Sequence, residues 1–200
     1  ELIEYKKCLD DPKYFAREYC KVIHLDKGLI PFDLYPYQEK MFDSFTSHRF
    51  NIVLACRQSG KSIAVVAYLL WYVIFKGEQV VGILANKNAI AREMLSRITL
   101  MLENLPFFLQ PGCTTLNKGS IGFSNNSRII AAATSSSSIR GMSLNLVYLD
   151  EFAFVENAAE FYTSTYPVIS SGKTSKIIIT STANGIGNMI LDVLPDDITG

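Results

Sequence analysis

The sequence has no excess of charge of either sign, because its 200 residues contain 19 Lys and Arg and 19 Asp and Glu. A neutral chain has no strong overall field to draw it to nucleic acid or to an anionic membrane, so any contact with DNA must be local. The sequence also lacks a long apolar run. The stretch at residues 68–75 is far shorter than the roughly 20 residues that span a bilayer, and no apolar signal core follows Glu1. We therefore expect a protein that is neither secreted nor bound to a membrane.

The four cysteines show no paired spacing, which argues against a zinc site or a small disulfide scaffold. They are scattered at Cys8, Cys20, Cys56 and Cys113. We expect reduced thiols in a cytosolic setting. A content of 48% hydrophobic and 19% charged residues is typical of a folded globular domain. Because the chain starts without methionine and stops at Gly200 without a tail, we expect it to be cut from a longer product.

From Asn51 onward, short apolar runs alternate with helix-length segments, which predicts an α/β fold with a mainly parallel central sheet flanked by helices. Strands are predicted at 51–55, 79–85, 127–132, 145–149 and 176–181, and helices at 61–75, 88–103 and 156–168. Residues 105–126 are rich in Pro and Gly and are expected to form a loop or a hairpin. We interpret 51–200 as one core of the P-loop NTPase class (RecA/ASCE-like) and 1–50 as an N-terminal extension of short helices and turns.

A phosphate-binding loop is predicted between the first of these strands and the first helix. Residues 55–62 read A-C-R-Q-S-G-K-S and match G-x-x-x-x-G-K-[ST], except that Ala55 replaces the first glycine. Backbone N–H groups and the dipole at a helix start both favour a bound anion. Lys61 would reach the β- and γ-phosphates of ATP, and the Ser62 hydroxyl would bind Mg²⁺. The loop residues expected to contact ATP are Arg57, Gln58, Ser59, Gly60, Lys61 and Ser62.

Arg57 occupies an unusual position for a guanidinium group, inside the phosphate loop. There it would lie against the γ-phosphate and stabilise the charge that develops in phosphoryl transfer, as an arginine finger does. The alternative is a solvated loop cation. Because of the loop around it, we favour the catalytic role.

Two adjacent acids, Asp150 and Glu151, end the apolar run at residues 146–149. The carboxyl ends of strands are where open α/β sheets bind ligands. Asp150 would hold Mg²⁺, directly or through water, and Glu151 would orient and polarise the attacking water. A surface Asp-Glu pair alone means little, but these acids follow a strand and have a phosphate loop upstream. Together the two motifs predict a hydrolytic site.

Hydroxyl groups end the last predicted strand, at Thr180, Ser181 and Thr182, before a turn signal at 183–185. Beside a γ-phosphate they would sense its presence and relay the change outward. The alternative is a set of ordinary Thr and Ser residues that cap a turn.

Tyr37 and Gln38 lie upstream of the phosphate loop, in the segment Y-P-Y-Q. Gln38 would bind the edge of adenine while Tyr37 stacks on it. A turn centred on Pro36 with packed tyrosines would give the same sequence.

The order of these motifs resembles the large terminase subunit of tailed bacteriophages, over most of the chain. The resemblance is carried by Tyr37-Gln38, Arg57-Gln58-Ser59-Gly60-Lys61-Ser62, Ile139-Arg140-Gly141, Leu149-Asp150-Glu151 and Thr180-Ser181-Thr182-Ala183-Asn184-Gly185. It is especially close to the myophage branch around 167–172 and 176–180. Ser181 and Ala183 stand where many relatives have Thr and Pro, a change that preserves the hydroxyl chemistry.

The resemblance implies an ATP-driven motor that docks on the portal protein of an empty prohead and packages double-stranded DNA, with ATP and Mg²⁺ as cofactors. It implies a catalytic Arg57 and Glu151, adenine binding by Tyr37 and Gln38, and coupling of hydrolysis to movement by residues 180–182. It also implies a small terminase subunit as partner, a ring of copies on the prohead and a location in the host cytoplasm. Arg140 would link the nucleotide to a neighbouring lobe or to DNA, or would be a simple loop cation. Family members carry a C-terminal nuclease domain that has no counterpart in these 200 residues, so we expect no nuclease activity.

Two other functions fit parts of the pattern. A helicase-like DNA-dependent ATPase shares a glutamine-containing adenine motif, an Asp-Glu pair and a third motif rich in Ser and Thr. It would need a second RecA-like lobe, which 200 residues do not accommodate beside this one. A non-hydrolysing nucleotide-binding module is the remaining alternative.

Overall fold

The computed structural model describes residues 1–134, 142–152 and 172–182. Strands and helices alternate over residues 50–103, as the sequence predicts. In chain order the elements are α1 (Leu2–Asp10), α2 (Pro12–Tyr19), β1 (Lys21–His24), β2 (Gly28–Pro31), α3 (Pro36–Ser47), β3 (Phe50–Leu54), α4 (Lys61–Phe75), β4 (Val80–Ala85), α5 (Asn88–Glu103), the 3₁₀ helix η1 (Phe107–Leu109), β5 (Cys113–Leu116), β6 (Ser120–Phe123), β7 (Arg128–Ala133), β8 (Leu146–Asp150) and β9 (Lys176–Ser181).

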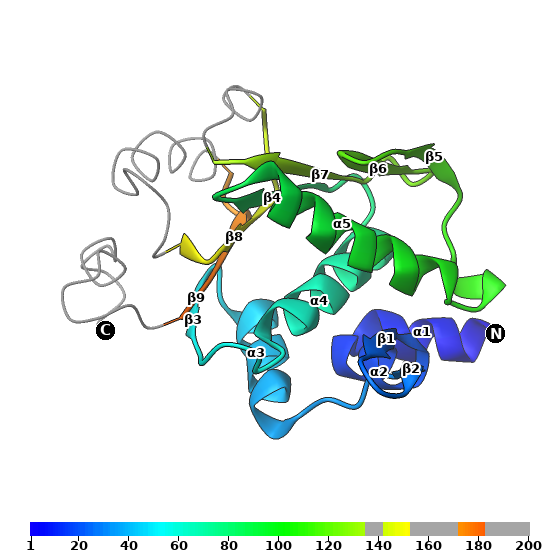
Figure 1. Cartoon of the computed structure of the whole chain (residues 1–200). Helices are drawn as coiled ribbons and strands as arrows, with labels where there is room; N and C mark the ends of the chain where they lie inside the picture. The colour runs from blue at the N-terminus through cyan, green and yellow to red at the C-terminus, as the bar shows by residue number, and fades with distance from the viewer. Residues whose placement is uncertain (135–141, 153–171, 183–200) are drawn as a thin grey trace.

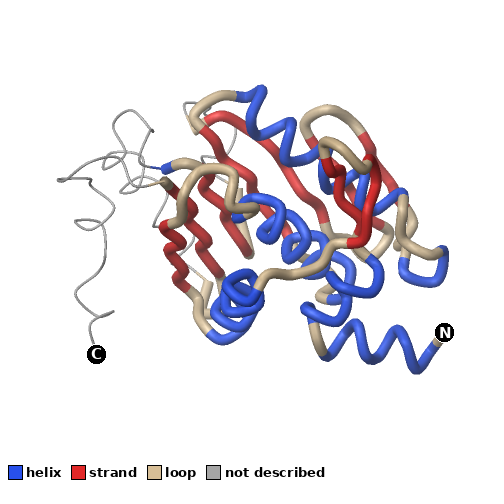
Figure 2. The backbone as a smooth tube through the Cα atoms, turned by 60° about the horizontal axis from the view of Figure 1, so that its bottom comes forward, coloured by secondary structure: helices blue, strands red, loops and turns tan. Residues whose placement is uncertain are grey.

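A seven-stranded sheet in the order β3-β9-β8-β4-β7-β6-β5 forms the centre of the fold. The five strands from β3 to β7 in this order are parallel, and the β5–β6 hairpin extends the sheet with antiparallel strands. Figure 1 shows α4 and α5 along one side of the sheet, and Figure 2 shows the same layers from below. The predicted α/β class with a mainly parallel sheet is confirmed. Strand β9, the last in the chain, lies between β3 and β8.

Helix α4 is apolar on all sides, and 13 of its 15 residues are buried. Such a helix needs partners around its whole circumference. The sheet covers one side of α4, and the N-terminal helices cover the other. Two buried hydrogen bonds join α4 to the N-terminal helices. Trp71 Nε1 donates to the Cys8 carbonyl at 2.7 Å, and Tyr68 OH donates to the Phe45 carbonyl at 2.9 Å. Residues 1–50 therefore share one hydrophobic core with the α/β sheet.

The boundaries predicted for the core strands agree with the structure to within one residue, and both long helices, α4 and α5, have the predicted bounds. Residues 105–126 contain the β5–β6 hairpin. The predicted helix at 156–168 lies outside the described residues. The prediction for residues 1–50 missed one element, the short antiparallel pair β1–β2, since only helices and turns were expected there. Its strands are largely exposed, so no burial pattern marked them, and Gly28 with φ 69° closes the turn.

No helix in the described part of the chain is both long and apolar enough to cross a bilayer. The four cysteines are free thiols, with Cys8 and Cys20 buried and Cys56 and Cys113 exposed. Burial raises the pKa of the Cys8 thiol to about 12, which keeps this buried thiol protonated and chemically inert.

Candidate active site

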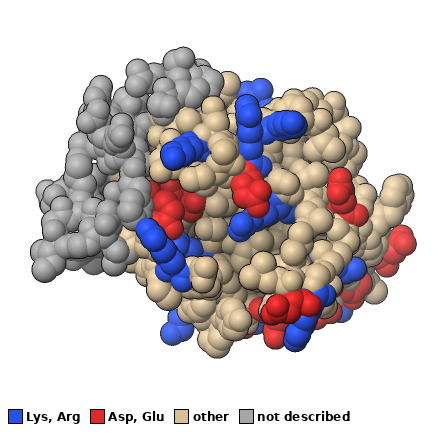
Figure 3. Space-filling model, viewed as in Figure 1, with Lys and Arg blue, Asp and Glu red and all other residues tan. Residues whose placement is uncertain are grey.

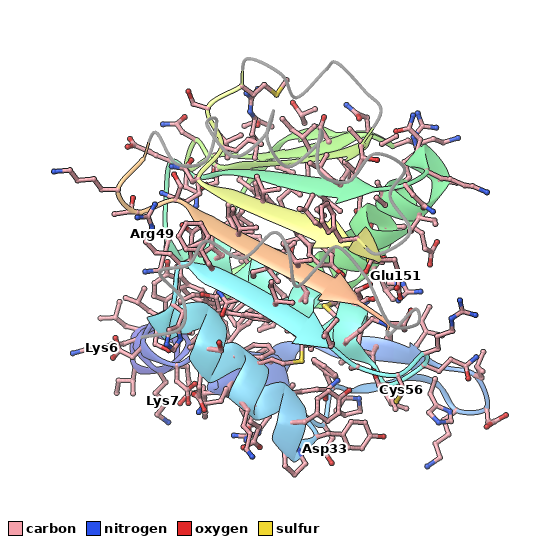
Figure 4. All side chains as sticks on the ribbon, turned by 90° about the vertical axis from the view of Figure 1, so that its left-hand side faces the viewer. Lys6, Lys7, Asp33, Arg49, Cys56 and Glu151 are labelled. Atoms are coloured by element: carbon pink, nitrogen blue, oxygen red, sulfur yellow. The ribbon has the colours of Figure 1, made fainter. Side chains whose placement is uncertain are left out.

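Strands β3, β8 and β9 end at the same edge of the sheet, and each end carries one of the predicted motifs. The phosphate loop follows β3, the two acids follow β8, and the hydroxyl motif ends β9. Figure 4 shows Glu151 and Cys56 at this carboxyl edge and Arg49 at the opposite edge. Because β9 lies between β3 and β8, the hydroxyl motif lies between the phosphate loop and the acids.

The phosphate loop turns from β3 into α4 through two residues with left-handed backbone conformation. Gln58 has φ 57° and Gly60, the residue just before the helix, has φ 86°. The positive φ favours glycine at this position, and a Cβ there would lie 2.9 Å from Gln38 Nε2 and would have to displace that amide. Arg57 is exposed on the loop, whereas Lys61 at the start of the helix is buried.

Two side chains of helix α3 donate hydrogen bonds to two consecutive backbone carbonyl groups of the phosphate loop. Gln38 Nε2 donates to the Gly60 carbonyl at 3.0 Å, and the hydroxyl of Tyr37 donates to the Ser59 carbonyl. The other atom of the same amide, Gln38 Oε1, accepts from the Tyr35 backbone N–H at 2.9 Å and caps the helix. Gln38 is buried, and Tyr35 stacks on Tyr37 with ring centroids 6.1 Å apart.

These contacts bear on the adenine role expected for Tyr37 and Gln38. Both polar atoms of the Gln38 amide are engaged with the backbone, and Tyr35 stacks on the ring of Tyr37. Tyr35 itself is 62% exposed, so its ring is the more accessible stacking surface. Adenine binding by Tyr37 and Gln38 stays a prediction, and the geometry adds a second role for them, namely support of the loop.

Glu151 connects the phosphate loop with β9. Its Oε1 pairs with Lys61 Nζ at 2.9 Å, and its Oε2 accepts from both the N–H and the hydroxyl of Thr182 at 3.0 Å. Burial by itself raises the pKa of the Glu151 carboxyl, but the bonds from Lys61 and Thr182 outweigh burial and hold the pKa below its usual value. Glu151 has a left-handed backbone with φ 48°, a strained conformation of the kind that clusters at functional sites. An ionised, oriented carboxylate therefore lies beside the phosphate loop.

Asp150 is buried at the end of β8, where one of its carboxylate oxygens accepts hydrogen bonds from three hydroxyl groups. Oδ1 lies 3.3 Å from Ser62 Oγ, 2.9 Å from Thr180 Oγ1 and 2.7 Å from the Tyr148 hydroxyl. A hydroxyl and a carboxylate suit Mg²⁺, which prefers oxygen ligands and usually keeps waters and phosphates in its shell. No cluster of three His, Cys, Asp or Glu suited to a metal occurs among the described residues.

The structure thus brings together most of the predicted site residues: the loop, Asp150, Glu151, Thr180 and Thr182. Ser181 is buried in β9 and its hydroxyl donates to the Thr182 carbonyl at 3.2 Å. Arg140 and the turn at 183–185 lie outside the described residues. Sequence reasoning missed Tyr148. Its position two residues before Asp150 on the same strand was the available signal, because such residues share one face of a sheet.

Replacing Gln38 by Ala is expected to lower the free energy of unfolding by about 1–2 kcal/mol, since two partly buried hydrogen bonds to the backbone are lost. ATP binding, measured by fluorescence titration, should weaken as well, because the Gly60 turn loses its support. Gln79→Ala is the matched control, since Gln79 also makes two hydrogen bonds through its amide, to Tyr72 and to the Gly77 carbonyl. Equal ATP affinity in the two variants would show that Gln38 supports only helix α3.

Comparison with known proteins places this arrangement in a family. The family model described as terminase large subunit, T4-like-virus type, N-terminal, matches residues 52–193. Among solved structures, the large terminase of bacteriophage HK97 is 19% identical with a TM-score of 0.76, covering 96% of this chain and 41% of that chain. The ATPase domain of the Thermus phage P74-26 large terminase is 19% identical with a TM-score of 0.63, covering 78% of this chain and 67% of that one.

A further large terminase, from a thermophilic bacteriophage and solved with ATP-γ-S, is 15% identical with a TM-score of 0.58, covering 74% of this chain and 38% of that one. At these identities the structural matches show a shared fold. This chain spans about two fifths of the length of the HK97 protein and of the protein solved with ATP-γ-S. Because the family model covers well over half of the chain, the protein belongs to the terminase large subunit family of the T4-like-virus type, as a match to its N-terminal part.

Proposed function

We propose that this chain is a Mg²⁺-dependent ATPase whose hydrolysis powers movement of double-stranded viral DNA into a prohead. The observation that carries the proposal is the chain of contacts from Lys61 through Glu151 to Thr182, which joins phosphate loop, acid and hydroxyl motif. Two facts about similar proteins support it. The P74-26 protein is an ATPase domain, and the thermophilic-bacteriophage terminase has been solved with ATP-γ-S and with ADP.

In the proposed site, N–H groups of residues 57–62 and the ammonium group of Lys61 hold the β- and γ-phosphates. Ser62 and Asp150 are the protein ligands of Mg²⁺, which neutralises phosphate charge when bound. Glu151 accepts a hydrogen bond from a water molecule whose oxygen attacks the γ-phosphorus. The bond to the ADP oxygen breaks, and the proton that the water loses passes to Glu151. The products are ADP and phosphate.

Coupling to movement would start at Glu151. In the structure Lys61 is paired with this carboxylate, whereas in the proposed complex it turns to the phosphates. Glu151 then keeps only the two bonds from Thr182 at the end of β9. At the other end of β9, Lys176 Nζ donates to the carbonyls of Phe45, Thr46 and His48, the last turn of α3. Strand β9 thus connects the catalytic acid to the helix that also supports the phosphate loop.

Arg57 is proposed to stabilise the transition state. Arg57→Ala is expected to lower turnover by about 10²–10³-fold, the usual effect of removing one donor aimed at developing charge, and to change ATP affinity much less. Steady-state turnover together with fluorescence titration of ATP measures both. Arg128→Ala serves as control, since Arg128 is an exposed arginine at the start of strand β7, outside the loop. An effect confined to affinity would reduce Arg57 to a phosphate clamp.

A local basic surface supports DNA as the partner. The neutral chain is uneven, because residues 51–134 contain eight Lys and Arg but only three Asp and Glu. Figure 3 shows Lys and Arg side chains gathered over α5. A cleft of about 330 Å³ lies between α5 and the β5–β6 hairpin, and it is lined by two leucines, Leu95 and Leu116, and by Arg92, Lys118, Ser96, Thr99 and Asn117. Cations with hydroxyl and amide donors suit the phosphate backbone of DNA.

The remaining partners follow from family membership and are part of the proposal. They are the portal protein of the prohead, a small terminase subunit and further copies of the chain in a ring, all within the host cytoplasm. The chain spans only part of the length of the solved relatives, so these partners of the whole protein belong to the proposal.

The test of the proposed function is ATP turnover with and without Mg²⁺ and blunt double-stranded DNA, beside a strand-separation assay. We expect Mg²⁺-dependent turnover that DNA stimulates, with no separation of strands. Strand separation would favour the helicase-like alternative. ATP binding without turnover, even with portal, small subunit and DNA added, would favour a non-hydrolysing module.

A further inference from the structure

The hydroxyl group of Tyr148 lies inside the cluster that would bind Mg²⁺, although the hydrolysis proposed above makes no use of it. It donates to Asp150 Oδ1 at 2.7 Å and lies 3.0 Å from Thr180 Oγ1, which itself donates to Asp150 Oδ1 at 2.9 Å. The three polar groups form a closed triangle across β8 and β9. Register explains the contact, because Asp150 pairs with Thr180 and Tyr148 lies two residues earlier on the same face of β8.

Burial makes this triangle a strong constraint. Tyr148 and Thr180 are fully buried and Asp150 is only 3% exposed, so water does not compete for their hydrogen bonds. The Tyr148 hydroxyl donates to one oxygen of the carboxylate at 2.7 Å, and this bond restricts the rotation of the carboxyl group.

We propose that Tyr148 is a positioning residue that holds Asp150 in the orientation required to bind Mg²⁺ and ties that carboxylate to Thr180 of the hydroxyl motif. The inference rests on the proposed function and adds to it a buried residue that donates to the proposed metal ligand. Donors of this kind behind a metal ligand commonly change metal affinity by about 10–100-fold when they are removed. A movement of β9 at Thr180 would then reach the metal ligand directly.

Tyr148→Phe keeps the ring in the core and removes only the hydroxyl. Titration calorimetry of ADP, at a series of Mg²⁺ concentrations and without Mg²⁺, reports metal binding independently of hydrolysis. We expect the half-saturating Mg²⁺ concentration to rise about tenfold, with metal-free ADP affinity unchanged. Thr180→Val is expected to raise the half-saturating Mg²⁺ concentration as well. Thr180→Ser, which keeps the hydroxyl group, should show the parent value.

Tyr68→Phe is the matched control, since Tyr68 is also a buried tyrosine, and its hydroxyl bonds a backbone carbonyl away from the site. It should leave the Mg²⁺ dependence at the parent value. A Mg²⁺ dependence of Tyr148→Phe equal to that of Tyr68→Phe would overturn the inference and leave the proposed function intact. Failure of the parent to bind ADP at all would instead overturn both. If Tyr148→Phe does not fold, the Thr180 pair decides by the same criterion.

Discussion

Replacing Glu151 by Gln is expected to reduce ATP turnover by about 10²–10⁴-fold while ATP still binds. The reason is that a neutral amide cannot accept a proton from the attacking water. Binding should even tighten. In the structure Glu151 pairs with Lys61 at 2.9 Å, and this pair must open before the ammonium group reaches a phosphate. The amide competes less strongly for Lys61. Single-turnover kinetics measures the chemical step, and titration with ATP measures binding.

The same substitution has a predicted effect on stability without nucleotide. Lys61 has a side-chain exposure of only 6%, so Glu151→Gln leaves a nearly buried ammonium group without its charged partner. Since Glu151 is itself 27% exposed, we expect a loss of only about 1–2 kcal/mol in the free energy of unfolding. Added ATP should restore more stability to the variant than to the parent, because the phosphates replace the missing partner.

Acidity gives a second test of this ion pair. The pKa of Glu151 is lowered in the folded protein from 4.5, so its contribution to stability is present above pH 4.5. It is lost as the pH falls from 4.5 through the lower folded pKa. The stability difference between parent and Glu151→Gln should therefore be constant near neutrality and shrink below pH 4.5, in denaturant unfolding at each pH.

Glu93→Gln is the control for both experiments, because Glu93 forms an ion pair with Arg97 on α5. This pair is exposed to solvent and therefore contributes far less to stability than the pair of Lys61 and Glu151. It should change neither turnover nor stability appreciably. Turnover of Glu151→Gln at the parent rate would show that another group activates the water.

Replacing Lys61 by Ala is expected to weaken ATP binding by roughly 10–150-fold, the loss of one or two hydrogen bonds to a charged group. Turnover should fall by at least about 10²-fold, since the same ammonium group would neutralise charge on the γ-phosphate in the transition state. Unlike Glu151→Gln, this variant should lose affinity and rate together. The contrast separates a residue that holds the phosphates from one that acts on water.

Lys76→Ala provides the comparison, because Lys76 caps the other end of the same helix α4 and is exposed. It should bind and hydrolyse ATP as the parent does. The Glu151 carboxylate left by Lys61→Ala keeps its two bonds from Thr182, so we expect little loss of stability. If Lys61→Ala kept full ATP affinity, the loop would not be the phosphate site.

Local signals made much of the site predictable. A strand, a short loop and a helix follow one another within residues 50–75, and their hydrophobic runs and the G-K-S triplet lie in one continuous segment. The acids of β8 and the hydroxyl groups of β9 each end a buried strand, and strand ends can be read from apolar runs. The β1–β2 pair escaped prediction because exposed strands leave no such pattern.

By itself, the sequence determined which chemical groups this protein presents and which end of each strand carries them, because both depend on neighbouring residues in the chain. Only the tertiary structure decided which groups meet. The insertion of β9 between β3 and β8 brings Thr182 to Glu151 and Thr180 to Asp150, through hydrogen-bonded registers that join residues about thirty positions apart. The packing of α3 against the loop likewise engaged the amide of Gln38, and the pleat of β8 brought Tyr148 to the carboxylate of Asp150, the proposed metal ligand. Such contacts depend on strand order and packing, which no local pattern encodes.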